Sequence, residues 1–226
     1  MTLKAALVVI AKAPAAGLSK TRLCPPCTPE QAAALAEAAL RDTLVAAAAT
    51  PAARRVLLLE GAPGSWAPEG FEVVPQRGSE LGERLTAGFD DIGVPALIVA
   101  ADVPQVTPAL LQEGLEALLV PDTEAVLGPT EDGGYWAIGL RRSHSGVFDG
   151  VPMSTSGTLD AQRDRLTELG LARRELPCLR DVDSMADALA VAWASPATRF
   201  AGAVAALPEP ARRAPSPVAA DRLLLR

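Results

Sequence analysis

The sequence predicts an α/β protein with three layers, in which helices cover both faces of a mostly parallel central sheet. Continuous apolar runs, such as 3–10 and 96–101, are typical of strands buried on both faces. Segments with helical spacing alternate with these runs, which favours parallel strands joined by crossover helices. At 226 residues the chain fits a single domain over 1–207, and the Pro-, Ala- and Arg-rich stretch 208–226 reads as a flexible tail.

The first half of the chain predicts most of the parallel sheet. Thr28, Pro29 and Gln31 form a capping box with proline at the first helical position, so a helix is expected to begin there. Thr107 and Pro108 cap a later helix in a similar way. The expected strands are 3–10, 54–59, 71–74 and 96–101, and the expected helices are 29–49, 79–91 and 108–119.

The second half predicts a break in the parallel pattern. Strand-like segments 125–127 and 135–140 flank a polar turn at 130–134, which indicates an antiparallel or edge excursion. A helix at 158–169, a short strand at 172–176 and a helix at 184–194 follow. The alanine-rich stretches 29–49 and 184–206 are expected to pack against the sheet, although packing against a partner chain, and hence an oligomer, stays open.

Charge and cysteine content narrow the classes of function. The net charge of −6 disfavours a protein that binds nucleic acid through a broad basic face. The apolar run at 5–10 is too short to span a membrane, and no targeting segment is visible. Three cysteines in a chain without a secretory signal favour a reducing compartment, so the cytoplasm is the expected location.

The loop at 11–27 is a predicted anion site. Residues 1–29 contain no Asp or Glu, whereas Lys12, Lys20 and Arg22 all fall there. This loop follows the first strand, and ligands of parallel sheets bind beyond the carboxyl ends of strands. Gly17 would let the backbone approach a nucleotide phosphate. The segment is not a P-loop, because Ser19 stands where that motif needs glycine; a merely solvated basic loop is the alternative.

Two aspartates are candidate metal ligands. Asp102 directly follows the strand 96–101, at the sheet edge where the basic loop emerges, and would hold a cation that bridges phosphates. Asp183, within Asp181-Val182-Asp183, would complete a Mg²⁺ or Mn²⁺ site. The alternatives are a turn or helix cap at Asp102 and a helix cap at Asp183 or Ser184.

The segment 128–136 is a candidate acceptor site. Its adjacent glycines, Gly133 and Gly134, suit a tight turn that lets a small molecule approach the backbone, with aromatic rings as walls. An ordinary hairpin turn with core aromatics is the alternative.

The cysteine pair and the histidine carry no predicted chemistry. Cys24 and Cys27 form an isolated CxxC without a second ligand pair, so we interpret them as incidental. His144 is interpreted as a surface residue, and the sequence has no other histidine for a catalytic triad.

Taken in order, the motifs resemble the DUF2064 family of bacterial glycosyltransferase-A-like proteins, which is distantly similar to the phospholactate guanylyltransferases. The resemblance covers about 3–194. It departs at Met153, where the family commonly has an aromatic residue, and at Ser184-Met185-Ala186. The segments that carry it are 11–14, Gly17, 20–23, Gln76, 81–85, 102–104, 127–129, 132–135, 154–155 and 181–183.

The resemblance implies a Rossmann-like sheet of the nucleotide-diphospho-sugar transferase superfamily and assigns roles by position. Lys20, Arg22 and Asp102 would be catalytic, and Asp102 and Asp183 would hold the metal. Nucleotide contacts would come from Ala11, Lys12, Gly17, Lys20, Arg22, Gln76, Gly82 and Arg84. Acceptor contacts would come from Asp132, Gly133, Gly134, Tyr135, Ser154 and Thr155.

Two transferase reactions fit this assignment. A nucleotidyltransferase would couple a nucleoside triphosphate to a small phosphorylated acceptor and release pyrophosphate, and the paired cations Lys20 and Arg22 favour it. A glycosyltransferase would use a nucleotide-sugar donor instead. A non-catalytic nucleotide-binding protein is the alternative of another class.

Overall fold

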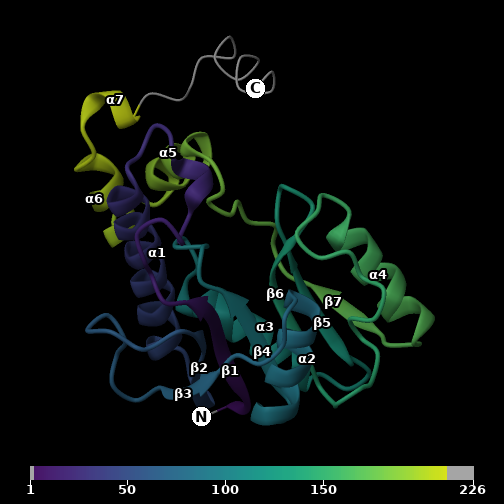
Figure 1. Cartoon of the computed structure of the whole chain (residues 1–226). Helices are drawn as coiled ribbons and strands as arrows, with labels where there is room; N and C mark the ends of the chain where they lie inside the picture. Colours follow the sequence, from purple (N-terminus) through teal and green to yellow (C-terminus); the bar gives the residue numbers. More distant parts are fainter. Residues whose placement is uncertain (1–2, 213–226) are drawn as a thin grey trace.

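The computed structural model describes residues 3–212, which form a seven-stranded sheet flanked by helices (Figure 1). No helix among these residues is long and apolar enough to cross a membrane. The strands are β1 (Leu3–Lys12), β2 (Ala52–Glu60), β3 (Glu72–Pro75), β4 (Ala96–Ala100), β5 (Ala125–Pro129), β6 (Tyr135–Leu140) and β7 (Arg173–Glu175). The helices are η1 (Thr21–Leu23), α1 (Pro29–Ala49), α2 (Leu81–Ile92), α3 (Pro108–Leu119), α4 (Thr158–Glu168), α5 (Met185–Ala194), α6 (Arg199–Ala205) and α7 (Glu209–Arg212).

The strand order places β1 at the point where the winding of the sheet reverses. The order is β3-β2-β1-β4-β6-β5-β7, and β1 runs parallel to both β2 and β4. The chain therefore winds outward from β1 to β3 and then returns to add β4 on the other side of β1. Ligands of such sheets bind at this switch point, beyond the carboxyl ends of the strands.

The predicted excursion is antiparallel, but it does not lie at an edge. β6 runs antiparallel to both β4 and β5 and lies between them, while β7 forms the edge by pairing in parallel with β5. The order of strands and turns along the chain shows that β6 reverses direction after β5, but it does not show between which strands β6 lies in the sheet. The mostly parallel α/β class is confirmed.

Two apolar layers cover the sheet, as the pattern of buried runs predicts. Leu7, Val9 and Leu97 point to the face covered by α1 and α3. Val8 and Ile98 point to the opposite face, where α2 and α4 pack. Successive residues of one strand thus serve both cores, which is why these strands lack polar positions.

The alanine-rich stretch 184–206 forms two helices, α5 and α6, because Pro196 interrupts it and proline is not tolerated in a helix interior. We expected this stretch to pack against the sheet, but α6 packs against α1 and α5 instead. In Figure 1, α5, α6 and α7 gather beside α1. The tail expected from 208 overlaps α7, whose Ala211 is buried. The rest of that expected tail, 213–226, lies outside the described residues.

Asp42 of α1 holds the start of α6. Its carboxylate accepts hydrogen bonds from the backbone N–H groups of Arg199, at 3.0 Å, and Phe200, at 2.8 Å, and its side chain is 9% exposed. It acts as a helix cap supplied by a distant segment.

We predict that Asp42→Ala lowers the free energy of unfolding by about 2 kcal/mol, because it leaves helix-start N–H groups unpaired. Chemical denaturation measures this loss. Glu37→Ala, which removes only the surface pair with Arg41 on the same helix, should cost less than about 0.5 kcal/mol. Equal losses would show that the carboxylate of Asp42 does not anchor α6.

Candidate nucleotide and metal site

A pocket of about 580 Å³ opens at the carboxyl ends of β1 and β4. These strands are neighbours, and Ile10 of β1 lies opposite Ala100 of β4. The segments that leave the two strands therefore face the same space. Of the predicted site residues, those that line the pocket are Ala11, Lys12, Lys20, Arg22, Gln76, Arg84, Asp102, Ser154 and Asp183.

Lys20 lies between two carboxylates. Its ammonium donates to Asp102 Oδ2 at 2.8 Å and to Asp183 Oδ1 at 3.2 Å, and its side chain is only 16% exposed. Burial alone would lower the pKa of Lys20, but the charges and hydrogen bonds of Asp102 and Asp183 together outweigh burial and raise it. The ammonium therefore stays charged and joins two loops that are far apart in the sequence.

Arg22 is the second cation of the basic loop. It lies in the short helix η1, which begins directly after Lys20, a residue with αL backbone. Its guanidinium pairs with Asp183, while 71% of its side chain is exposed to solvent. An exposed pair of this kind contributes little to stability and breaks easily, so Arg22 can turn toward a ligand in the pocket.

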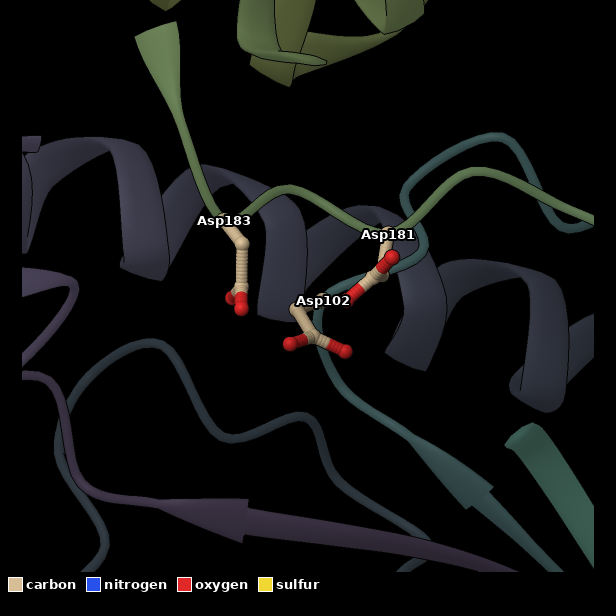
Figure 2. A group of neighbouring side chains, drawn as sticks. All are labelled: Asp102, Asp181 and Asp183. Carbon is tan, nitrogen blue, oxygen red and sulfur yellow. The ribbon is translucent and has the colours of Figure 1, made fainter. Parts of the chain in front are cut away.

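Asp102, Asp181 and Asp183 form an acidic cluster (Figure 2). One carboxylate oxygen of each lies within 4.8 Å of the others. Asp102 follows β4, and the other two belong to the segment between β7 and α5, so the cluster joins two loops. Asp181 belongs to the Asp181-Val182-Asp183 motif, but it was not among the ligands predicted from the sequence.

Backbone contacts hold the two loops of the cluster together. The N–H of Val182 donates to the carbonyl of Asp102 at 3.3 Å, and the Gln105 side chain amide donates to the carbonyl of Arg180. Ser184 caps α5 by accepting from the N–H of Asp187, so the segment passes directly from the cluster into a helix. The capping alternative is thus taken by Ser184, and Asp183 is left facing the pocket.

The electrostatics of the cluster favour a cation. Burial, followed by the charges of Asp132, Asp102 and Asp183, raises the pKa of Asp181 from 3.8 to about 6. Three carboxylates offer hard oxygen ligands, which suit Mg²⁺ or Mn²⁺. Lys20 already supplies positive charge between two of these carboxylates. The donor set therefore fits a divalent metal held by Asp102, Asp181 and Asp183.

A second network shapes the pocket floor around Glu60. The Glu60 carboxylate pairs with Lys12 at 3.1 Å and with Arg84. Burial would raise the pKa of Glu60, but the hydrogen bonds and charges of Lys12 and Arg84 outweigh it and lower the pKa. Glu60 was not predicted from the sequence, yet it lies opposite Lys12 in the parallel register of β1 and β2.

Gln76 and Arg84 contact backbone around this network. The Gln76 amide donates to the carbonyls of Ala11, at 2.7 Å, and Leu58, at 3.0 Å. The Arg84 guanidinium donates to the carbonyls of Gly78 and Ser79. Both side chains line the pocket, but the Gln76 amide binds strands β1 and β2, and the Arg84 guanidinium binds the segment before α2.

The acceptor-side motif forms a tight turn against the segment before α4. The Asp132 carboxylate accepts from Gly134 N–H at 2.9 Å and from the Thr130 hydroxyl. Gly133 has φ of +90°, and a Cβ there would lie 2.1 Å from the carbonyl oxygen of Ser156. Glycine is therefore required at this position by packing.

The other predicted acceptor residues divide into two groups. Ser154 lines the pocket, with φ of +59°. The Thr155 hydroxyl accepts from Gly157 N–H and so belongs to the turn before α4. The Tyr135 hydroxyl contacts Met153 and Gln162 in the interior, and burial raises its pKa. Neither the Thr155 nor the Tyr135 hydroxyl is brought to the pocket.

The remaining predicted residues play local structural parts. Gly17 has φ of +77° in the basic loop, and Gly82 faces Phe148 and Met153 from the first turn of α2. Cys27 is buried with its Sγ 3.9 Å from the Met185 sulfur, and burial raises its pKa. Among the residues that the structure describes, the cysteines and His144 form no cluster that would hold a metal.

The doubly wound sheet, with a basic loop and an acidic cluster at its switch point, is the architecture that the resemblance to glycosyltransferase-A-like proteins implies. A sequence profile of DUF2064, described as an uncharacterized protein conserved in bacteria, matches residues 31–155. The chain belongs to this family. No curated protein matches its sequence.

Solved structures share the fold over most of the chain. A candidate nucleotide-diphospho-sugar transferase from Desulfovibrio desulfuricans G20 is 25% identical, with a TM-score of 0.77 over 86% of this chain and 88% of that one. Rv0371c of Mycobacterium tuberculosis H37Rv in complex with manganese is 22% identical, with a TM-score of 0.50 over 84% and 98%. CMP:2-keto-3-deoxy-manno-octonic acid synthetase in complex with CTP is 13% identical, with a TM-score of 0.54 over 86% and 99%.

We predict that Asp181→Asn stabilises the protein in EDTA at pH 8, by on the order of 1 kcal/mol after allowance for solvent screening of a half-exposed carboxylate. The raised pKa means that the folded state binds the proton more tightly than the unfolded state. The ionised carboxylate therefore costs stability above about pH 6, and this cost disappears below about pH 4. Urea denaturation at several pH values measures the effect.

Two comparisons make this measurement specific. Asp164→Asn, on the exposed side of α4, should change stability by less than about 0.5 kcal/mol at every pH. With Mn²⁺ and a nucleoside triphosphate both at saturation, the wild type should instead become the more stable protein, because the Asp181→Asn variant has lost a ligand that stabilises the metal-bound state. If Asp181→Asn were less stable than the wild type in EDTA at pH 8, the ionised Asp181 carboxylate would not destabilise the folded protein, contrary to the prediction.

Proposed function

We propose that this protein is a metal-dependent nucleotidyltransferase that couples a nucleoside triphosphate to a small phosphorylated acceptor and releases pyrophosphate. The observation that carries the proposal is the convergence in one pocket of two cations, Lys20 and Arg22, with Asp102 and Asp183 of the acidic cluster. A triphosphate carries more negative charge than the diphosphate part of a nucleotide sugar, so two side-chain cations beside a metal suit the triphosphate.

The reaction needs little covalent chemistry from the protein. An acceptor phosphate oxygen forms a bond to the α-phosphorus as the bond from that phosphorus to the bridging oxygen of the β-phosphate breaks, and pyrophosphate leaves with the bonding electrons. Lys20 and Arg22 would bind the β- and γ-phosphates and neutralise the leaving group. Catalysis would then rest on positioning and on electrostatic stabilisation.

The metal would be held by Asp102 and Asp183, with Asp181 as a further ligand. When bound, Mg²⁺ or Mn²⁺ would neutralise phosphate charge, a role in which such ions keep several non-protein ligands. The manganese complex of Rv0371c and the CTP complex of the octonic acid synthetase support the use of this fold for such ligands.

The walls of the pocket would orient the nucleotide. Lys12 and Arg84, which both pair with Glu60, would border the nucleotide together with Ala11 and Gln76. Ser154 is the predicted acceptor residue that lines the same pocket, and Asp132 with its glycines would form the outer border on that side.

Glycosyl transfer from a nucleotide sugar is the second candidate. The likeness to the candidate nucleotide-diphospho-sugar transferase of Desulfovibrio desulfuricans G20 favours it. In that reaction the nucleoside diphosphate leaves, and the metal alone would neutralise much of its charge.

Isothermal titration with each nucleoside triphosphate, and with UDP- and GDP-sugars, distinguishes the two reactions. We expect one triphosphate to bind tightly only with Mg²⁺ or Mn²⁺, and nucleotide sugars to bind at least tenfold more weakly. Tighter binding of a nucleotide sugar would favour a glycosyltransferase. Binding of neither class of ligand would indicate a non-catalytic role.

We predict that Asp102→Asn removes the metal dependence of triphosphate binding without unfolding the protein, because a neutral amide is a poor ligand for a hard cation. Titrations of the variant, with and without Mg²⁺, measure this loss. Asp164→Asn is the matched control and should bind as the wild type does. Unchanged metal dependence in the Asp102 variant would exclude Asp102 from the site.

A further inference from the structure

Lys20 occupies the position at which a metal would contact the aspartates. Its ammonium nitrogen lies 2.8 Å from Asp102 Oδ2 and 3.2 Å from Asp183 Oδ1. A small divalent cation binds carboxylate oxygens at roughly 2.1 Å, so an ion on these two oxygens would be in contact with the ammonium. Like charges at such a short distance repel strongly in a partly buried site. The ammonium and the metal therefore compete for the same carboxylate oxygens.

From this competition we propose that Lys20 is a built-in cation that keeps free metal out of the cluster, so that the site takes the metal–nucleoside triphosphate complex as its ligand. The inference rests on the proposed function, in which the triphosphate is the donor. A triphosphate offers phosphate oxygens to Lys20 and further ligands to the metal. In that complex Lys20 would bind the phosphates, which would free the carboxylates of Asp102 and Asp183 to hold the metal.

The surroundings of Lys20 permit this exchange. Its loop is held mainly by contacts within itself, where Ala15 N–H donates to the Ser19 hydroxyl and the carbonyl of Ala15 accepts from Leu18 and Ser19. Leu18 at the tip of the loop is 80% exposed, and Gly17 has open space around it. The ammonium can therefore move toward the pocket without disturbing the core.

Lys12 provides a contrast within the same pocket. It also lines the space beyond β1, but it pairs with Glu60 and contacts none of the three aspartates. Its charge is thus near the predicted phosphate position without competing for the metal oxygens. Comparing variants of the two lysines therefore separates the effect of positive charge in the pocket from the effect of an ammonium that occupies the carboxylate oxygens.

The test is titration of the nucleotide-free protein with MnCl₂ alone, followed by the electron paramagnetic resonance of free Mn²⁺. We expect Lys20→Ala to bind Mn²⁺ at least tenfold more tightly than the wild type. Lys20→Gln, which is one bond shorter but keeps a neutral donor for a carboxylate, should also bind more tightly. Lys20→Arg, which keeps the charge, and Lys12→Ala should both remain as weak as the wild type.

Each outcome is decisive, because loss of structure cannot by itself increase metal affinity. Equal Mn²⁺ affinity in the wild type and in folded Lys20→Ala and Lys20→Gln would overturn the competition while leaving the metal site in place. Tighter binding by Lys12→Ala as well would also overturn it, because the effect would then be general charge. No Mn²⁺ binding by any folded variant would overturn the metal site itself, and with it the proposed function.

Discussion

Mutual repulsion of three carboxylates is the constraint around which the switch point of this sheet is organised. Asp102, Asp181 and Asp183 keep one oxygen each within 4.8 Å of the others, and burial, together with the charges of neighbouring carboxylates, raises the pKa of Asp181. If this edge of the sheet had no ligand to bind, the three carboxylates would be expected to turn apart into solvent. Here the strand order, two backbone contacts and the bridging ammonium of Lys20 hold them together. Strain of this kind is typical of sites that bind a cation or carry out chemistry.

The sheet topology explains why the two halves of the site meet. Because β1 and β4 are parallel neighbours, the basic loop and Asp102 leave the sheet at the same edge. The packing of α5 and α6 on α1 then brings the segment that carries Asp181 and Asp183 across this edge. The helices that look peripheral in Figure 1 thus position two of the three carboxylates of the cluster.

Much of this arrangement follows from the sequence, because its strongest signals are local. Continuous apolar runs identify the buried strands, and capping residues identify the starts of α1 and α3 within a residue. The helix expected at 184–194 corresponds to α5, whereas α6 was expected only as part of the alanine-rich stretch 184–206. The place of β6 inside the sheet carries no local signal, since it depends on how β4 and β5 pair.

The site was predictable in its backbone positions and less so in its side-chain directions. Lys20, Asp102 and Asp183 follow from their place after strands or before a helix. Glu60 was missed because its partners become apparent only with the register of β1 and β2. Tyr135 was expected at the acceptor, but its hydroxyl lies in the interior, and sequence does not reveal which side of a turn a ring occupies.

The most direct test of the account is a crystal structure of the protein with Mn²⁺ and the triphosphate that it binds most tightly, with the metal located by anomalous scattering. We expect the anomalous peak to place Mn²⁺ within bonding distance of at least two carboxylates among Asp102, Asp181 and Asp183, with the Lys20 ammonium bound to the phosphates. A metal and nucleotide bound elsewhere, or Lys20 still bridging Asp102 and Asp183 beside the bound nucleotide, would contradict it.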